Sequence, residues 1–128
     1  MKILGIGVDV IQNKRIKNLI NNETFITKTF GINEVKFSKK FKNKTNYFAK
    51  RFAAKEAFAK SLGTGFRNNL NFKDIEILNN KLGKPYYFKS KKIDFLVNKR
   101  FKIKRYDLFL SISDEKEYSV AFTILQTK

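Results

Sequence analysis

The segment TNYFAKRFAAKEAFAKSL, residues 45–62, decides the fold of this chain. It is rich in alanine and has no β-branched residue after Thr45, so it predicts a long helix. Thr45 or Asn46 can cap the start of this helix, and Gly63 is placed to end it in a left-handed turn. One side of the helix carries small residues that would let another element approach closely: Ala49, Ala53 and Ala57.

The segments around this helix predict an α+β fold, in which a mainly antiparallel sheet packs against the long central helix. Apolar patterns predict a buried strand at 3–10 and half-buried strands at 74–78, 86–88, 108–113 and 120–124. They also predict helices at 12–22 and around 93–97, and one or two short helices within 24–43. The last two strands are expected to form a hairpin around a turn near 114–117. No internal repeat or linker is evident, so residues 1–128 are predicted to be a single domain.

The composition excludes several kinds of chemistry. The chain has no Cys and no His, which rules out a disulfide scaffold, a thiol nucleophile, an iron–sulfur cluster and an ordinary zinc site. Acid–base catalysis must therefore use carboxylate, Lys, Tyr or water. No stretch approaches the ~20 apolar residues that a bilayer requires, so we expect a soluble, cytoplasmic protein without a membrane partner.

The charge balance indicates an anionic partner. Against 28 Lys and Arg residues stand 11 Asp and Glu residues, for a net charge of +17. Such a field attracts nucleic acid, polyphosphate ligands or acidic proteins. A composition rich in Lys, Asn, Ile and Phe is also consistent with the bias of an AT-rich genome. Lysines interleaved with aromatics in FKIKRYDLF, residues 101–109, leave a small basic nucleic-acid-binding protein as an alternative.

Two carboxylates are candidates for a metal site. Asp9 interrupts an apolar strand, where a buried carboxylate needs a cation or hydrogen-bond donors, or else caps the next helix. Glu56 lies at the edge of the apolar face of the long helix, four residues before Lys60, and the two form either an exposed ion pair or a site for metal and phosphate. Mg²⁺ is typically held by one or two carboxylates plus substrate phosphates, so Asp9 and Glu56 together predict a Mg²⁺ site.

The tripeptide Gly63-Thr64-Gly65 follows this helix. Its backbone N–H groups could approach a phosphate closely, although a plain helix stop and turn explains the same residues.

Five motifs in order along the chain resemble the holo-[acyl-carrier-protein] synthase family, the small bacterial 4′-phosphopantetheinyl transferases. They are GIGVDV (5–10), NKRI (13–16), RFAAKEAFAKSLGTG (51–65), GKPY (83–86) and LSISDEKEYSVAF (110–122). The resemblance implies transfer of the 4′-phosphopantetheine arm of coenzyme A to a serine of apo acyl carrier protein, with release of adenosine 3′,5′-bisphosphate. It also implies a homotrimer with active sites between protomers, and no nucleic-acid partner.

The same resemblance implies roles for particular residues. Asp9 and Glu56 would hold Mg²⁺, Lys60 would face the transferring phosphoryl group, and Glu56 or a water on the metal would take the proton of the carrier serine. Contacts to coenzyme A would come from Arg51, Lys55, Gly63, Thr64, Gly65, Lys84, Pro85 and Ser113. The acidic carrier would dock on the first helix, at Lys14, Arg15 and Lys17.

The chain departs from the family pattern at Asp114, which stands where the family usually has a His near the coenzyme phosphates. A carboxylate there would repel phosphate, so we expect Asp114 to point away, to pair with a lysine such as Lys116, or to add a metal ligand. The departure leaves a catalytically impaired member of the same fold as a further alternative.

Overall fold

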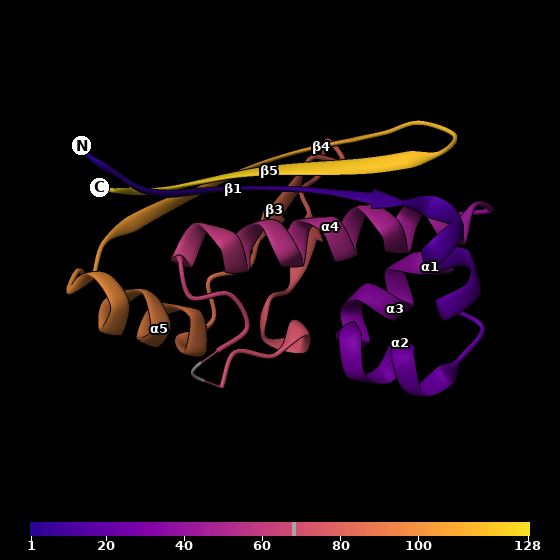
Figure 1. Cartoon of the computed structure of the whole chain (residues 1–128), viewed down its shortest axis with the longest axis horizontal. Helices are drawn as coiled ribbons and strands as arrows, with labels where there is room; N and C mark the ends of the chain where they lie inside the picture. The colour runs from indigo at the N-terminus through magenta and orange to yellow at the C-terminus, as the bar shows by residue number, and fades with distance from the viewer. Residues whose placement is uncertain (68) are drawn as a thin grey trace.

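The structure is a computed structural model that describes residues 1–67 and 69–128, and it has the α+β fold that the sequence predicts (Figure 1). Its elements in chain order are β1 (Ile3–Gln12), α1 (Asn13–Leu19), α2 (Glu23–Thr29), α3 (Ile32–Ser38), α4 (Lys44–Leu62), the 3-10 turn η1 (Phe72–Asp74), β2 (Ile77–Asn79), β3 (Pro85–Tyr87), α5 (Lys91–Phe101), β4 (Tyr106–Asp114) and β5 (Tyr118–Thr127). The buried apolar side chains of these elements form one cluster, to which α4 contributes more residues than any other element.

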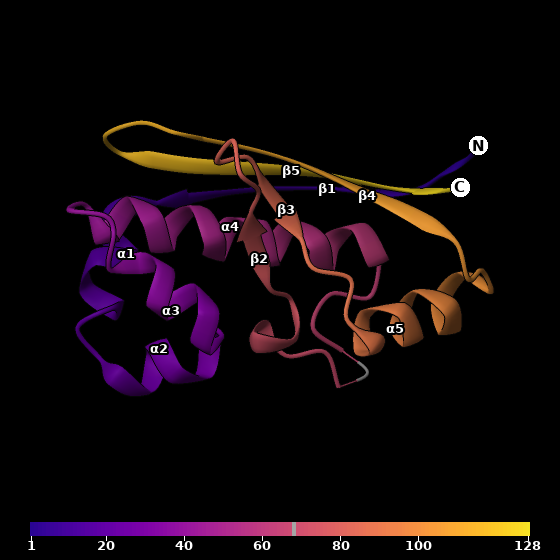
Figure 2. The same cartoon turned by 180° about the vertical axis from the view of Figure 1, so that it is seen from behind.

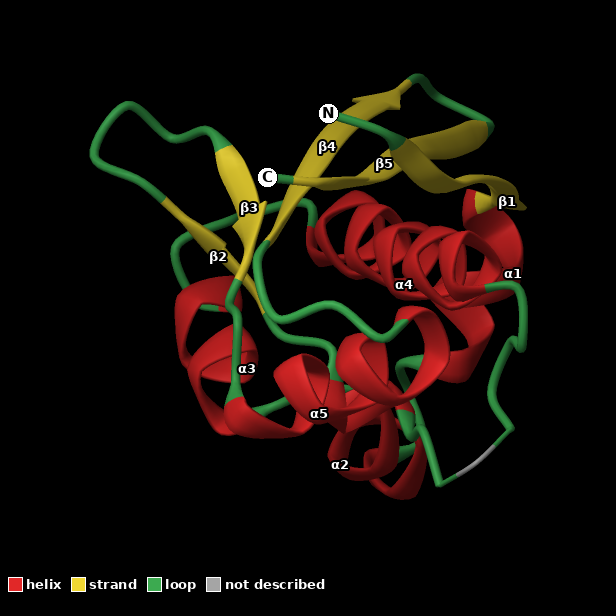
Figure 3. Ribbon diagram, turned by 90° about the vertical axis from the view of Figure 1, so that its left-hand side faces the viewer, coloured by secondary structure: helices red, strands yellow, loops and turns green. Residues whose placement is uncertain are grey.

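The strands form two antiparallel sheets. The larger has the order β1-β5-β4, and β2 pairs only with β3. The hairpin predicted for the last two strands is confirmed as β4 and β5. Figure 3 shows the three-stranded sheet on one side of α4 and the other helices on the remaining sides.

The predicted central helix is confirmed as α4, and Gly63 ends it with a left-handed φ of 81°. The predicted cap is wrong, because the side chain of Asn43 accepts the hydrogen bond from the Asn46 N–H, at 3.1 Å. The strand expected at 74–78 begins only at Ile77, because η1 takes up the residues before it. The segment 24–43 contains two short helices, α2 and α3.

Only one face of β1 is buried, so the prediction of a fully buried strand is wrong for the other face. Paired residues in an antiparallel sheet point to the same side. Ile6, Val8 and Val10 pair with Ile124, Phe122 and Val120 on the outer face. The exposed fractions of Ile6, Val8 and Val10 are 59%, 49% and 61%.

The inner face of β1 lies directly on α4, and the two elements run side by side in both Figure 1 and Figure 2. Two glycines allow this approach. A Cβ at Gly5 would be 1.8 Å from the carbonyl oxygen of Ser61, and a Cβ at Gly7 would be 1.8 Å from that of Ala57. The small residues predicted to admit a neighbour, Ala53 and Ala57 among them, are fully buried in this contact region.

Gly7→Ala tests the close contact between β1 and α4. The added Cβ would displace backbone, so we expect the free energy of unfolding to fall by about 3 kcal/mol, at the upper end of overpacking costs. Chemical denaturation measures this change. Gly31→Ala is the control, because its nearest side-chain or backbone atom would be 3.5 Å away; it should cost below about 1 kcal/mol. Equal losses in the two variants would contradict the packing described here.

Candidate functional site

Asp9 lies on the inner face of β1, the face that also carries Gly5 and Gly7. Its side chain is therefore directed toward α4 and keeps only 16% of its surface exposed. Burial raises the pKa of Asp9, and the positive charges of Lys60 and Arg15 oppose this rise. Asp9 does not cap α1, because the residue at the cap position is Gln12. The helix-cap interpretation of Asp9 is therefore wrong.

Glu56 and Lys60 approach Asp9 from α4. The Nζ of Lys60 donates to the carbonyl oxygen of Val8, at 2.9 Å, and lies 3.4 Å from Oδ1 of Asp9. Burial, followed by the negative charge of Asp9, raises the pKa of Glu56. Among the ion pairs of the described residues, Lys60 has Asp9 as its partner rather than Glu56. The structure thus brings the three predicted reaction-centre residues together.

The two carboxylates suit a divalent cation. Burial already penalises both negative charges, and a cation between them would relieve that penalty. No group of three or more potential metal-ligating side chains occurs among residues 1–67 and 69–128. Two carboxylates with open positions fit Mg²⁺, which completes its coordination with water and substrate phosphates. Asp9 and Glu56 are thus a chemically suitable pair for Mg²⁺.

Arg15 is exposed on α1. Its positive charge opposes the rise that burial causes in the pKa of Asp9 and of Glu56. Lys14 and Lys17 are exposed on the same helix, α1, which the fully buried Ile16 holds against the core. These two lysines line an open hollow of about 570 Å³, together with residues of the start of α4 and Lys116. The predicted docking helix is thus exposed and lies next to the reaction centre.

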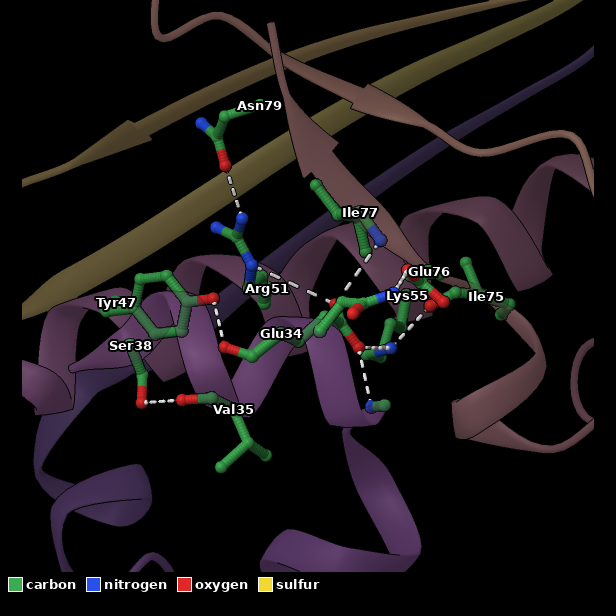
Figure 4. Close-up of polar contacts among 12 residues, drawn as sticks. Glu34, Val35, Ser38, Tyr47, Arg51, Lys55, Ile75, Glu76, Ile77 and Asn79 are labelled. Carbon is green, nitrogen blue, oxygen red and sulfur yellow. Dashed lines mark hydrogen bonds and ion pairs between the residues drawn. The ribbon is translucent and has the colours of Figure 1, made fainter. Parts of the chain in front are cut away.

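Lys55 is not available to coenzyme A. Its side chain has no exposed surface, and its Nζ donates to Oε1 of Glu34 at 2.7 Å. The same ammonium also donates to the carbonyl oxygen of Phe72 and to that of Ile75, which Figure 4 labels. Burial lowers the pKa of Lys55, and the charge of Glu34 opposes that effect. The prediction of Lys55 as a coenzyme ligand is wrong, because this buried ion pair joins α3 and α4 to the segment before β2.

Arg51 belongs to the same buried network but reaches its edge. The guanidinium donates to Oδ1 of Asn79 in β2, and its Nε lies 3.8 Å from Oε2 of Glu34 (Figure 4). That Nε is buried and has no hydrogen-bond partner among the described residues. Arg51 also borders a surface hollow of about 220 Å³ beside β2 and β3. Unlike Lys55, Arg51 therefore borders open space, although its unpartnered Nε is itself buried beside Glu34.

The turn after α4 does not offer its glycine N–H groups to a ligand. The N–H of Gly63 donates to the carbonyl oxygen of Lys60, at 3.0 Å, and the N–H of Gly65 donates to that of Ala59, at 3.2 Å. Both bonds satisfy the last carbonyls of the helix. These bonds favour the interpretation as a helix stop over a phosphate cradle built from the two N–H groups, and contacts of Gly63 and Gly65 with coenzyme A stay a prediction. Thr64 lies between them and lines a hollow beside α5.

The remaining predicted coenzyme contacts lie away from Asp9 within one chain. Lys84 and Pro85 follow the tip of the β2–β3 hairpin, where Gly83 has a φ of 88°. Ser113 pairs with Val120 and so lies on the outer face of the sheet, opposite to the face that carries Asp9. No hydrogen bond or ion pair of the described residues links Lys84 or Ser113 to the reaction centre.

Asp114 pairs with one lysine and one asparagine of α4 rather than with Lys116. Its Oδ2 accepts from the Nδ2 of Asn46 at 2.8 Å, and its Oδ1 lies 3.8 Å from the Nζ of Lys50. Asn13 holds the same turn from α1, since its Nδ2 donates to the carbonyl oxygens of Glu115 and Lys116. The β4–β5 turn is therefore fastened to both α1 and α4.

Sequence reasoning gave no structural role to Glu34 or Asn13, and it considered Asn46 only as a possible helix cap. One local signal exists for Glu34. It stands three residues after Gly31 at a helix start, and its Oε1 accepts from the Gly31 N–H at 2.9 Å. The long-range partners of all three residues have no signature in the local sequence.

Comparisons with known proteins match the chain over nearly its whole length. A family model described as the 4′-phosphopantetheinyl transferase superfamily matches residues 5–123. The holo-[acyl-carrier-protein] synthase of Pelagibacter ubique is 57% identical over 128 residues, with all of both chains covered. A crystal structure of the Neisseria meningitidis holo-[acyl-carrier-protein] synthase has a TM-score of 0.86 at 36% identity, covering 98% of this chain and 99% of that one.

A second crystal structure is that of a Bacillus anthracis holo-(acyl-carrier-protein) synthase in complex with CoA (3′,5′-ADP). It has a TM-score of 0.82 at 34% identity and covers all of both chains.

Proposed function

This chain belongs to the 4′-phosphopantetheinyl transferase superfamily, and on that premise we propose that Asp9, Glu56 and Lys60 form the reaction centre of a holo-[acyl-carrier-protein] synthase. The enzyme transfers the 4′-phosphopantetheine group of coenzyme A to a serine of apo acyl carrier protein and releases adenosine 3′,5′-bisphosphate. The observation that carries the residue assignment is the meeting of two partly buried carboxylates and one lysine where β1 crosses α4.

The reaction forms a bond between the serine oxygen and the phosphorus of the pantetheine arm, and breaks the bond from that phosphorus to the leaving bisphosphate. Asp9 and Glu56 would hold Mg²⁺, which when bound supplies positive charge to the diphosphate. The ammonium of Lys60 is about half exposed and able to turn from Asp9 toward the phosphoryl oxygens. Glu56 or a water on the metal would accept the serine proton.

We further propose that the nucleotide end of coenzyme A lies along the β2–β3 hairpin. Arg51 has an unused buried N–H beside a surface hollow, and Lys84 is exposed near the hairpin tip. Pro85, Thr64 and Ser113 stay predicted contacts. Ser113 lies on the outer face of the sheet, so it would have to act on the coenzyme bound by a neighbouring protomer.

The sequence leaves two alternative functions, a nucleic-acid-binding protein and a catalytically impaired member of the family. The full-length match to named synthases favours the transferase over the small nucleic-acid-binding protein. Pairing of Asp114 with Asn46 and Lys50 offsets its charge, which argues against impaired catalysis. None of the described helices is long and apolar enough to cross a bilayer. A cytoplasmic location stays a prediction.

Glu56→Gln tests the reaction centre. The amide keeps the size of the side chain but loses the charge that holds the cation, so we expect Mg²⁺-dependent transfer of a labelled pantetheine arm to fall by about 100-fold or more. Glu23→Gln, which changes an exposed carboxylate of α2, is the matched control and should keep full activity. A Glu56→Gln enzyme that is folded by circular dichroism and retains most of its activity would overturn the assignment.

We propose that the acidic carrier docks on α1, at Lys14, Arg15 and Lys17. All three side chains are exposed, and the charge of Arg15 acts on the carboxyl group of Asp9. A carrier seated there would have its serine guided toward Asp9 and Glu56. Opposite charges on the two proteins would also accelerate their encounter, in a manner that salt weakens.

Lys17→Glu separates docking from catalysis, because Lys17 is exposed and makes no ion pair with Asp9 or Glu56 among the described residues. We expect the KM for the carrier to rise about fivefold or more, with the KM for coenzyme A unchanged. Lys36→Glu makes the same charge change on the exposed side of α3 and controls for net charge. An equal rise for both substrates, or for both variants, would count against docking on α1.

We also propose that the chain assembles as a homotrimer through the outer face of its main sheet. This face exposes large apolar side chains from all three strands, including Val8, Phe109 and Phe122. Exposed apolar patches of this kind mark association surfaces.

Sedimentation equilibrium tests this assembly. The wild-type protein should have three times the 15.0 kDa mass of the chain. Phe122→Glu places a charge in the middle of the apolar face and should give monomers. A monomeric wild-type protein, or a trimer that survives this substitution, would contradict the proposal.

A further inference from the structure

A cationic hollow of about 160 Å³ lies between the end of α4 and α5. Arg67, Lys99 and Arg100 contribute positive charge to its walls, and Thr64 contributes a hydroxyl. Its floor includes the buried leucines Leu62 and Leu96. The hollow therefore combines three cations and a hydroxyl donor with an apolar base.

The positive charge of this hollow is not neutralised within the described part of the chain. Its described lining residues include no carboxylate. None of the ion pairs found among residues 1–67 and 69–128 involves Arg67, Lys99 or Arg100. Three cations that line one hollow favour the binding of an anion, because the anion relieves their mutual repulsion.

The negative end of α4 does not cancel this preference. The carbonyl oxygen of Leu62 accepts from the Nε of Arg100, at 3.1 Å, and Gly63 and Gly65 satisfy the carbonyls before it. The guanidinium of Arg100 is held in place by this bond and by its stacking over the ring of Phe101, at 4.9 Å from the ring centroid. Its terminal N–H groups make no hydrogen bond with the described residues and are free for a ligand.

We propose that this hollow binds the phosphate group of a small phosphate monoester whose ester group is apolar. A phosphate dianion has three acceptor oxygens and matches three cations and a hydroxyl better than a singly charged carboxylate does. The leucine floor would take up the ester group.

The hollow is separate from the reaction centre. Lys60 points toward β1, whereas Leu62, two residues later, points to nearly the opposite side of α4. The hollow shares Thr64 with the predicted coenzyme contacts, so the variant that tests it changes only cations of the hollow and leaves Thr64 and Lys60 in place.

Backbone amide NMR of the full chain, titrated with inorganic phosphate, tests this site. Saturable shifts should centre on the residues that line the hollow, with sodium acetate at equal ionic strength giving none there. The double variant Arg67→Ala/Lys99→Ala should weaken phosphate binding about tenfold or more. Lys91→Ala/Lys104→Ala removes two exposed lysines outside the hollow and should bind like the wild type.

Phenyl phosphate distinguishes an ester from free phosphate. Tighter binding than inorganic phosphate is expected, because its ring would cover the leucine floor; weaker binding would overturn the monoester assignment. Chemical shifts that do not saturate with phosphate, or that acetate reproduces, would overturn the site itself. Equal loss of phosphate binding in the two double variants would overturn it as well. Melting curves of both double variants establish that each is folded.

Discussion

The direct contact of β1 with α4 is the constraint on which the rest of the molecule depends. Gly5 and Gly7 leave no side chain between the strand and the helix, so the two backbones touch. Alternation along the strand then places Asp9, two residues after Gly7, on the same face. Asp9 thereby meets Glu56 and Lys60 of the helix. The same burial disfavours the charged form of both carboxyls and so raises the pKa of each. A bound cation would stabilise the charged forms and offset this penalty.

Local sequence was sufficient for the parts of the fold that local chemistry determines. Alanine content predicted α4, Gly63 predicted its end, and alternation predicted the final hairpin. Periodicity could not reveal that one face of β1 is exposed, because a strand apolar on both faces looks the same whether solvent, another layer or another protomer covers its outer side. The pairing of Asp9 with Glu56 was predicted from the position of one carboxylate in an apolar strand and of the other at the edge of an apolar helix face, and the family resemblance implied the same pair.

The site predictions that failed or stayed open share a physical cause. Lys55 and Arg51 are both basic residues of one helix. Lys55 forms a buried ion pair with Glu34, whereas the Nε of Arg51 has no hydrogen-bond partner among the described residues. The different hydrogen bonding of Lys55 and Arg51 depends on Glu34, which lies in another helix. The local sequence of α4 therefore does not reveal which of the two residues is buried in an ion pair. Gly63 and Gly65 were ambiguous for a related reason, because a helix stop and a phosphate loop need the same backbone freedom. Only the hydrogen-bond partners distinguish the two.

The measurement that tests the central claim most directly is Mn²⁺ binding, as a spectroscopic substitute for Mg²⁺ at a carboxylate site. Electron paramagnetic resonance with coenzyme A present, corrected for the ion that coenzyme A binds alone, should find one bound Mn²⁺ per chain. Asp9→Asn and Glu56→Gln should each weaken that binding about tenfold or more, and Glu23→Gln should leave it unchanged. Wild-type affinity in either of the first two variants would contradict a cation shared between β1 and α4.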